Sequence, residues 1–190
     1  MIQFALALLA LSMVGLMLAV ALVDLASSRL RIWPPESKGN WAQTWFVRVF
    51  RLMFYALLGA SVLLLWEPAN RPPVARMALG AGLAALGFGL AVFATLWMGW
   101  RTAFGDTGPL ALSGPFRYSR HPVYVATWLG QLGWALLVDD PLIRLALILW
   151  AALYIVAIRL EEPWMLARFG ADYAAYQRST PQLIGRPRRP

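Results

Sequence analysis

The chain contains no cysteine and only one histidine, His121, among its 190 residues. The absence of cysteine excludes disulfides and thiolate chemistry. One histidine without cysteine also argues against a dedicated zinc or iron site. Charged residues make up only 14% of the chain, and the basic ones are spread among the predicted loops without forming a stripe. That distribution argues against nucleic-acid binding.

Apolar residues dominate what remains. Hydrophobic residues are 60% of the chain and the mean hydropathy is +0.59, which is typical of an integral membrane protein. The sequence predicts an all-α, single-domain membrane protein (1–190) with three N-terminal spans in 1–100 and a core in 101–190. The five predicted spans are residues 2–23, 47–66, 77–100, 123–138 and 142–158. The start lacks a basic n-region, so we expect residues 2–23 to be a retained helix.

The last two predicted spans are separated only by Asp139-Asp140-Pro141, which predicts an antiparallel helical hairpin. A helix of sixteen residues rises about 24 Å. This is short of a hydrocarbon core of roughly 30 Å, so a recessed hairpin would leave a cavity where its ends emerge. The third span carries Gly80, Gly82, Gly87 and Gly89, which permit close helix contact. Ordinary membrane-helix composition accounts for them better than a specific dimer seam.

Basic residues are distributed unequally between the two sides of the predicted bundle. With five spans, the first and third loops and the C-terminal tail share one side, which holds 14 basic residues. The other side holds 3, and the two together make the 17 of the chain. The positive-inside rule then predicts an N-terminus outside and a C-terminus in the cytoplasm, in the cytoplasmic membrane.

Polar residues gather at the cytoplasmic ends of the last spans. Gly114 to Tyr124 reads Gly-Pro-Phe-Arg-Tyr-Ser-Arg-His-Pro-Val-Tyr, and Glu161-Glu162 follows the next apolar segment. Ionisable groups are costly at such positions, so they predict a polar ligand pocket. Arginine forks match carboxylates, glutamates suit an ammonium or ribose hydroxyls, and aromatic faces suit adenine or a sulfonium. Taken singly, each residue is also compatible with a membrane anchor or a solvated helix end.

These residues, followed by Phe169-Gly170 and by Tyr173 with Tyr176, resemble the isoprenylcysteine carboxyl methyltransferase family. That family shares its C-terminal motif with phospholipid methyltransferases. The resemblance covers roughly residues 108–184. It implies an all-helical membrane enzyme that uses S-adenosyl-L-methionine in a cytosolic C-terminal pocket, with a lipophilic substrate entering from the bilayer.

Residue by residue, the resemblance implies a cofactor site and two acceptor-orienting arginines, Arg120 and Arg159. The implied cofactor-binding residues are Arg117, Tyr118, His121, Pro122, Tyr124, Glu161, Glu162 and Tyr173. The chain departs from the family pattern at Thr107-Gly108-Pro109, where many members carry a histidine. A carboxylate acceptor would need only positioning, whereas a thiol or amine would need a base such as His121 or a glutamate.

Two other classes of function stay open at this point. A membrane reductase using a nicotinamide cofactor would have a similar C-terminal part, although such enzymes usually have more spans. A non-enzymatic transporter or scaffold would be favoured by charges inside the spans, and the spans contain almost none.

Overall fold

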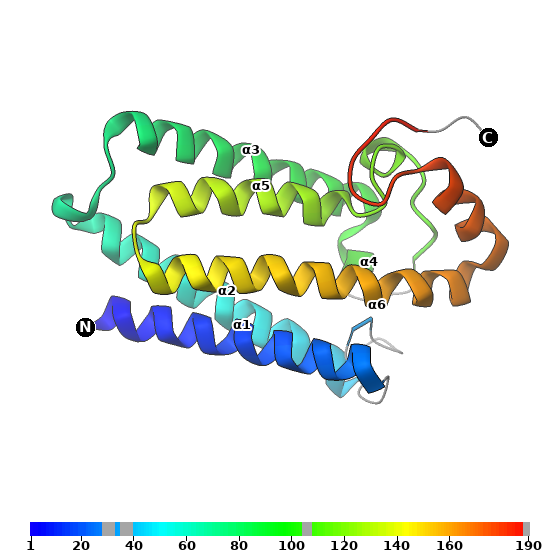
Figure 1. Ribbon diagram of the computed structural model, residues 1–190, viewed down its shortest axis with the longest axis horizontal. Coiled ribbons are helices and arrows are strands. Elements are labelled where there is room, and N and C mark those ends of the chain that lie inside the picture. The colour runs from blue at the N-terminus through cyan, green and yellow to red at the C-terminus, as the bar shows by residue number, and fades with distance from the viewer. Residues whose placement is uncertain (28–32, 35–39, 104–107, 188–190) are drawn as a thin grey trace.

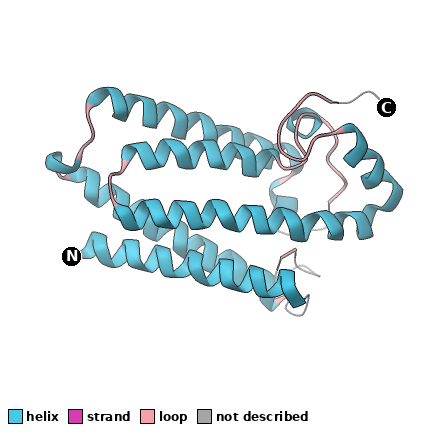
Figure 2. Ribbon diagram, viewed as in Figure 1, coloured by secondary structure: helices cyan, strands magenta, loops and turns pink. Residues whose placement is uncertain are grey.

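The structure is a computed structural model, and it describes residues 1–27, 33–34, 40–103 and 108–187. Within these residues it is helical and has no strands (Figure 2). The main helices are α1 (Ile2–Ser27), α2 (Trp41–Trp66), α3 (Val74–Met98), α5 (Pro122–Leu137) and α6 (Pro141–Ser179). Shorter helical elements are η1 (Pro68–Asn70), α4 (Trp100–Ala103) and η2 (Gly114–Arg117). The predicted all-α membrane fold is confirmed.

Four helices, α1, α2, α3 and α6, are long and apolar enough to cross a membrane. The remaining predicted span, 123–138, corresponds to α5, which has 16 residues and is not among these four. Local signals explain where the helices begin. Asn40 caps α2 by accepting a hydrogen bond from the Gln43 amide (2.8 Å), and Asp140 caps α6 through the Ile143 amide (3.0 Å).

The helices form a bundle in which α1 lies against α2 and α6, while α3 lies alongside α5 (Figure 1). A hydrophobic core joins these two halves. Its large buried members include Met53, Trp134 and Trp150, and small residues such as Ala10 and Ala60 let the helices approach. The predicted hairpin is present as α5 and α6, which are connected by residues 138–140.

Glycines determine how closely α3 and α5 approach. A Cβ atom added to Gly87 would lie 2.1 Å from the amide nitrogen of Gly130, and one added to Gly133 would lie 2.2 Å from that of Ala84. The glycines of α3 are thus not only average membrane-helix composition, because Gly87 forms part of a contact within the chain. Gly82 and Gly89, by contrast, have no atom within 4 Å of an added Cβ.

Helix α6 is much longer than the predicted span 142–158. It continues past the apolar part to Ser179, so Glu161 and Glu162 lie inside the helix rather than at its end. At Gly170 the backbone turns with φ 53° and ψ −124°. This positive φ favours glycine, and here the chain folds back over the end of the bundle (Figure 1).

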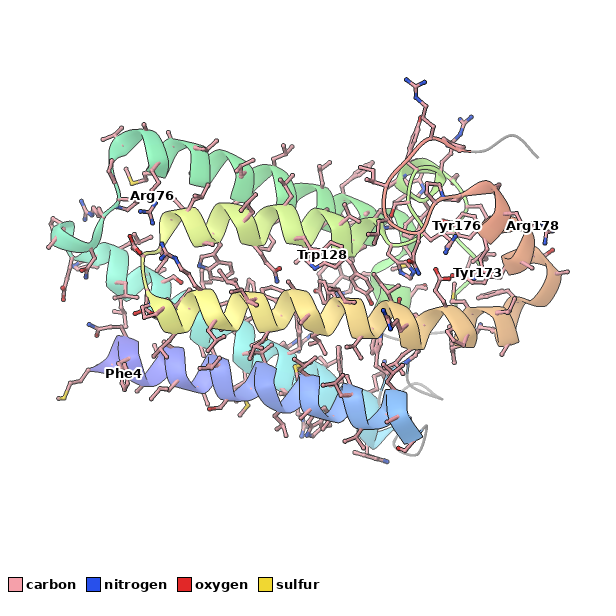
Figure 3. The ribbon with its side chains drawn as sticks, in the orientation of Figure 1. Phe4, Arg76, Trp128, Tyr173, Tyr176 and Arg178 are labelled. Carbon is pink, nitrogen blue, oxygen red and sulfur yellow. The ribbon has the colours of Figure 1, made fainter. Side chains whose placement is uncertain are left out.

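The opposite end of the bundle is held by charges around the hairpin link. Arg76 of α3 donates to the Leu136 carbonyl (2.8 Å) and to Asp139 (3.1 Å), and Arg144 lies 2.6 Å from the same carboxylate. The hydrogen bond from Arg76 and the charge of Arg144 lower the pKa of Asp139. Figure 3 places Arg76 at the end of the molecule away from Tyr173 and Tyr176.

Candidate functional site

The single histidine lies between the two adjacent glutamates. His121 is the N-cap residue of α5, and the following Pro122 keeps its backbone out of the helical region (φ −126°, ψ 55°). Its side chain is buried, with Nδ1 3.4 Å from Glu161 Oε2 and Nε2 3.1 Å from Glu162 Oε1. Burial lowers the pKa of His121, but the two glutamates more than offset this and raise it above 6.5. Both ring nitrogens thus face a carboxylate oxygen.

Glu161 contacts three side chains from two different parts of the chain. Its Oε1 atom accepts from the Tyr124 hydroxyl and from the Trp33 indole nitrogen (2.5 Å), while Oε2 faces His121. The Tyr124 ring stacks on the His121 ring, with centroids 5.7 Å apart and planes 3° apart. Glu161 thus joins the segment after α1 to the start of α5.

Glu162 binds a different partner, Arg120. The guanidinium donates Nε to Oε1 (2.8 Å) and one terminal nitrogen to Oε2 (3.0 Å). Its other terminal nitrogen donates to the carbonyls of Gln177 (3.2 Å) and Thr180 (2.8 Å). Burial raises the pKa of Glu162, but hydrogen bonds from His121, Arg120 and Gln177 outweigh burial and hold that pKa at about 2.

The returning part of α6 closes over this cluster. Tyr173 and Tyr176 are buried, and the Tyr176 hydroxyl donates to the carbonyls of Phe116 (2.6 Å) and Ser119 (3.3 Å) (Figure 3). Burial raises the pKa of both tyrosines. The Phe-Gly-x-x-Tyr-x-x-Tyr pattern therefore has a structural basis, because the turn at Gly170 brings these tyrosines onto the loop before α5.

A cavity of about 170 Å³, here called cavity A, lies at this polar end. Charged side chains and aromatic rings line it together. They include Arg120, His121, Glu161, Trp164, Arg168 and Phe169. The Arg168 guanidinium lies 5.2 Å from the ring centroids of both Trp164 and Phe169, a cation–π arrangement.

A second cavity of about 470 Å³, cavity B, lies within the apolar part of the bundle. Helices α1, α2, α3, α5 and α6 contribute to its walls, which are mainly aromatic. They include Phe46, Phe50, Phe54, Phe88, Trp150 and Tyr154.

The structure brings most of the predicted site residues together. Cavity A is lined by Arg120, His121, Pro122, Tyr124, Glu161 and Tyr173. Glu162 lies behind His121 and holds Arg120. The family resemblance implies that Arg120 orients the acceptor. In the structure its guanidinium makes four hydrogen bonds within the chain itself.

Three predicted residues lie apart from the cluster. Arg117 and Tyr118 are exposed and line neither cavity, because the buried side chain of their 3-10 turn is Phe116. Arg159 is exposed and also lines neither cavity. At 3.6 residues per turn, it points about 200° around α6 from Glu161. The Thr107 position, where the family departure was noted, lies outside the described residues.

Two residues of the site were missed in the sequence. Trp33 reads as an interfacial anchor, and nothing near it in the sequence indicates a partner 128 residues away. Arg168 directly precedes the Phe169-Gly170 pair, and this position could have drawn attention to it. Among the described residues, no group of three or more His, Cys, Asp or Glu side chains could hold a metal ion.

Comparison with known proteins assigns a class to this arrangement. A family model described as phospholipid methyltransferase matches residues 75–172, just over half of the chain. The chain therefore belongs to the phospholipid methyltransferase family. Together with the membrane-spanning helices, this membership supports an integral membrane methyltransferase.

Two relatives each match just over half of the chain. It is 32% identical over 105 residues to the cobalt-zinc-cadmium resistance protein CzcN of Cupriavidus metallidurans, covering 55% of this chain and 48% of that protein. It is 28% identical over 101 residues to the nickel-cobalt-cadmium resistance protein NccN of Alcaligenes xylosoxydans xylosoxydans, covering 53% and 47%. The matches span about half the length of these relatives. No solved structure matches the chain significantly.

Proposed function

We propose that this protein transfers a methyl group from S-adenosyl-L-methionine to a lipophilic acceptor that enters from the bilayer. The observation that carries the proposal is the meeting of two unlike cavities. Cavity A is lined by charged and aromatic groups, cavity B is lined mostly by aromatic and aliphatic side chains with Asp24 and Arg51 among them, and both are lined by Tyr124. A polar cofactor in the first and an apolar acceptor in the second would meet at this residue.

The side chains of cavity A fit the cofactor. A carboxylate has about four lone-pair sites, and Glu161 uses three toward Trp33, Tyr124 and His121, which leaves capacity for a hydroxyl or ammonium group. The rings of Trp164 and Phe169 offer faces to adenine or to a sulfonium. When bound, S-adenosyl-L-methionine supplies an electrophilic methyl group. The protein then contributes orientation and the exclusion of water.

The contacts that His121 makes with Glu161 and Glu162 favour a carboxylate acceptor, as in the isoprenylcysteine methyltransferases that the chain resembles. A thiol or amine must lose a proton, and His121 and Glu161 are the candidate bases in cavity A. Both ring nitrogens of His121 already face a carboxylate, and Glu161 already accepts from Tyr124 and Trp33, so neither group is free to take that proton. A carboxylate needs no base, so it suits this site better.

The cofactor assignment predicts the effect of Glu161→Gln. We expect this variant to bind S-adenosylhomocysteine about tenfold or more weakly, because a charge-assisted hydrogen bond contributes roughly 1.5–3 kcal/mol. Calorimetric titration of the purified protein measures this. Glu67→Gln is the control, since Glu67 is exposed at the far end of α2. Unchanged affinity in Glu161→Gln contradicts the assignment.

Titration of the wild-type protein separates the alternatives. Binding of S-adenosylhomocysteine but not NADPH supports a methyltransferase. Binding of NADPH alone supports the reductase, and binding of neither supports a transporter or scaffold.

The orientation also belongs to this proposal: an outside N-terminus and a cytoplasmic C-terminus, in the cytoplasmic membrane. It rests on the division of basic residues into 14 and 3. A reporter that is active only in the cytoplasm should be active when fused to the C-terminus and inactive when fused to the N-terminus. The reverse pattern contradicts the orientation and moves cavity A to the opposite face.

A further inference from the structure

Cavities A and B are separated by a thin partition of side chains. Among the residues that the structure describes, Trp33, Val123 and Tyr124 line both cavities. Val123 and Tyr124 belong to α5, inside the family-matched region. Trp33 comes from the segment between α1 and α2, outside residues 75–172. The N-terminal half of the chain thus supplies one wall of the site.

Trp33 is held at one edge and on one face of its ring. Its indole nitrogen donates to Glu161 Oε1 (2.5 Å), the same oxygen that accepts from the Tyr124 hydroxyl. Its ring stacks on Phe46 of α2, with centroids 4.5 Å apart and planes 22° apart. Phe46 also lines cavity B. Glu161 Oε1, on the cavity A side, therefore holds both Trp33 and Tyr124 in position.

The volumes of the two cavities show why their separation matters. Ligand pockets usually measure about 300–1,000 Å³. Cavity B, at about 470 Å³, lies in that range, whereas cavity A, at about 170 Å³, lies below it. A small movement of the Trp33 ring would join the two spaces, because the ring borders both.

We propose that Trp33 is a positioning residue that divides the two cavities and determines how far an apolar acceptor can advance toward the cofactor. Its indole blocks the polar end of cavity B, and its hydrogen bond to Glu161 makes that block sensitive to what binds in cavity A. The names of the two occupants rest on the proposed function. The partition itself does not, because it follows from the lining residues.

The absence of cysteine from the chain allows a direct test. Thr127 lines cavity B and not cavity A, is buried, and differs little in size from cysteine. In the Thr127→Cys protein in nanodiscs, a charged water-soluble methanethiosulfonate reagent that enters from cavity A passes the partition before it reaches the thiol. The membrane-permeant N-ethylmaleimide can arrive through the lipid and reports the intrinsic reactivity of the thiol. The measurement is the ratio of the two modification rates.

Adding Trp33→Ala to Thr127→Cys should raise this ratio about tenfold or more, because the ring that blocks the charged reagent is gone. Adding Trp33→Phe should raise it less than Trp33→Ala does, since an aromatic ring can still stack on Phe46 although the hydrogen bond to Glu161 is lost. The matched control is Trp41→Ala, because Trp41 is 66% exposed and lines neither cavity.

Equal ratios in Thr127→Cys with and without Trp33→Ala would overturn the proposal. An equal rise with Trp41→Ala would do so as well, because it would indicate general loosening. Thermal unfolding of each variant shows that it is folded, and Trp33→Leu replaces Trp33→Ala if the latter does not fold. S-adenosylhomocysteine binding is measured separately. If the wild-type protein does not bind S-adenosylhomocysteine, the proposed function is rejected, but the proposal that Trp33 divides cavities A and B is not.

Discussion

Replacing Arg120 with alanine is expected to lower the free energy of unfolding by about 3–5 kcal/mol, the usual cost of removing one partner from a buried ion pair. The side chains of Arg120 and Glu162 are only 11% and 14% exposed. Removing the guanidinium would leave Glu162 with fewer partners and two carbonyls without their donor. Denaturant titration in mild detergent measures the change. Arg159→Ala is the control. Arg159 is exposed on α6, the helix that carries Glu162, and its replacement should change stability by no more than about 0.5 kcal/mol.

Arg120→Lys distinguishes two roles. Arg120 either holds Glu162 in place, as its hydrogen bonds indicate, or orients the acceptor, as the family resemblance implies. An ammonium lacks the planar fork that binds both oxygens of Glu162, so we expect intermediate stability. S-adenosylhomocysteine affinity should fall with it, because Arg120 directly precedes His121 and fixes the same glutamate. Normal stability and cofactor affinity with methyl transfer lost by a hundredfold would instead support an acceptor-orienting Arg120.

The second large effect is expected at the contact between α3 and α5. Gly87→Ala would put Cβ 2.1 Å from a backbone nitrogen, and Gly133→Ala would put it 2.2 Å from one. Backbone cannot move aside as a flexible side chain does, so α5 must shift away from α3. We expect each variant to lose about 1–3 kcal/mol or more of stability, the usual cost of overpacking.

Helix α3 also provides the control for this prediction. Gly82→Ala and Gly89→Ala add a methyl group where nothing lies within 4 Å. They should be neutral or slightly stabilising, because alanine favours a helix over glycine. Because α5 carries Tyr124, displacing it should also weaken S-adenosylhomocysteine binding in Gly87→Ala and Gly133→Ala. Equal stability in all four variants would contradict a close helix contact.

Hydrophobic patterning allowed much of the fold to be predicted. Apolar runs marked each main helix, and the three-residue link at Asp139 to Pro141 required α5 and α6 to be neighbours. The far end of α6 was harder to predict. After Ile158 the residues become polar while the helix continues, since helical hydrogen bonds do not depend on side-chain polarity.

The sequence by itself determined the class of fold and identified several residues of the candidate site. Long apolar segments leave few alternatives to membrane helices, because backbone polar groups in lipid must be satisfied within the segment. Local motifs likewise identified His121, Tyr124 and Glu161, which the structure brings to one cavity.

Tertiary structure decided which partner each of these groups has. Whether Arg120 is free or bound to Glu162 depends on how α6 folds back at Gly170. Arg159 lies apart from the site because of its phase on a helix whose rotation is set by packing. Trp33 reaches Glu161 across 128 residues, and such a contact depends on the arrangement of whole helices. Spacing along the chain records local geometry, whereas these pairings are fixed only when the helices pack.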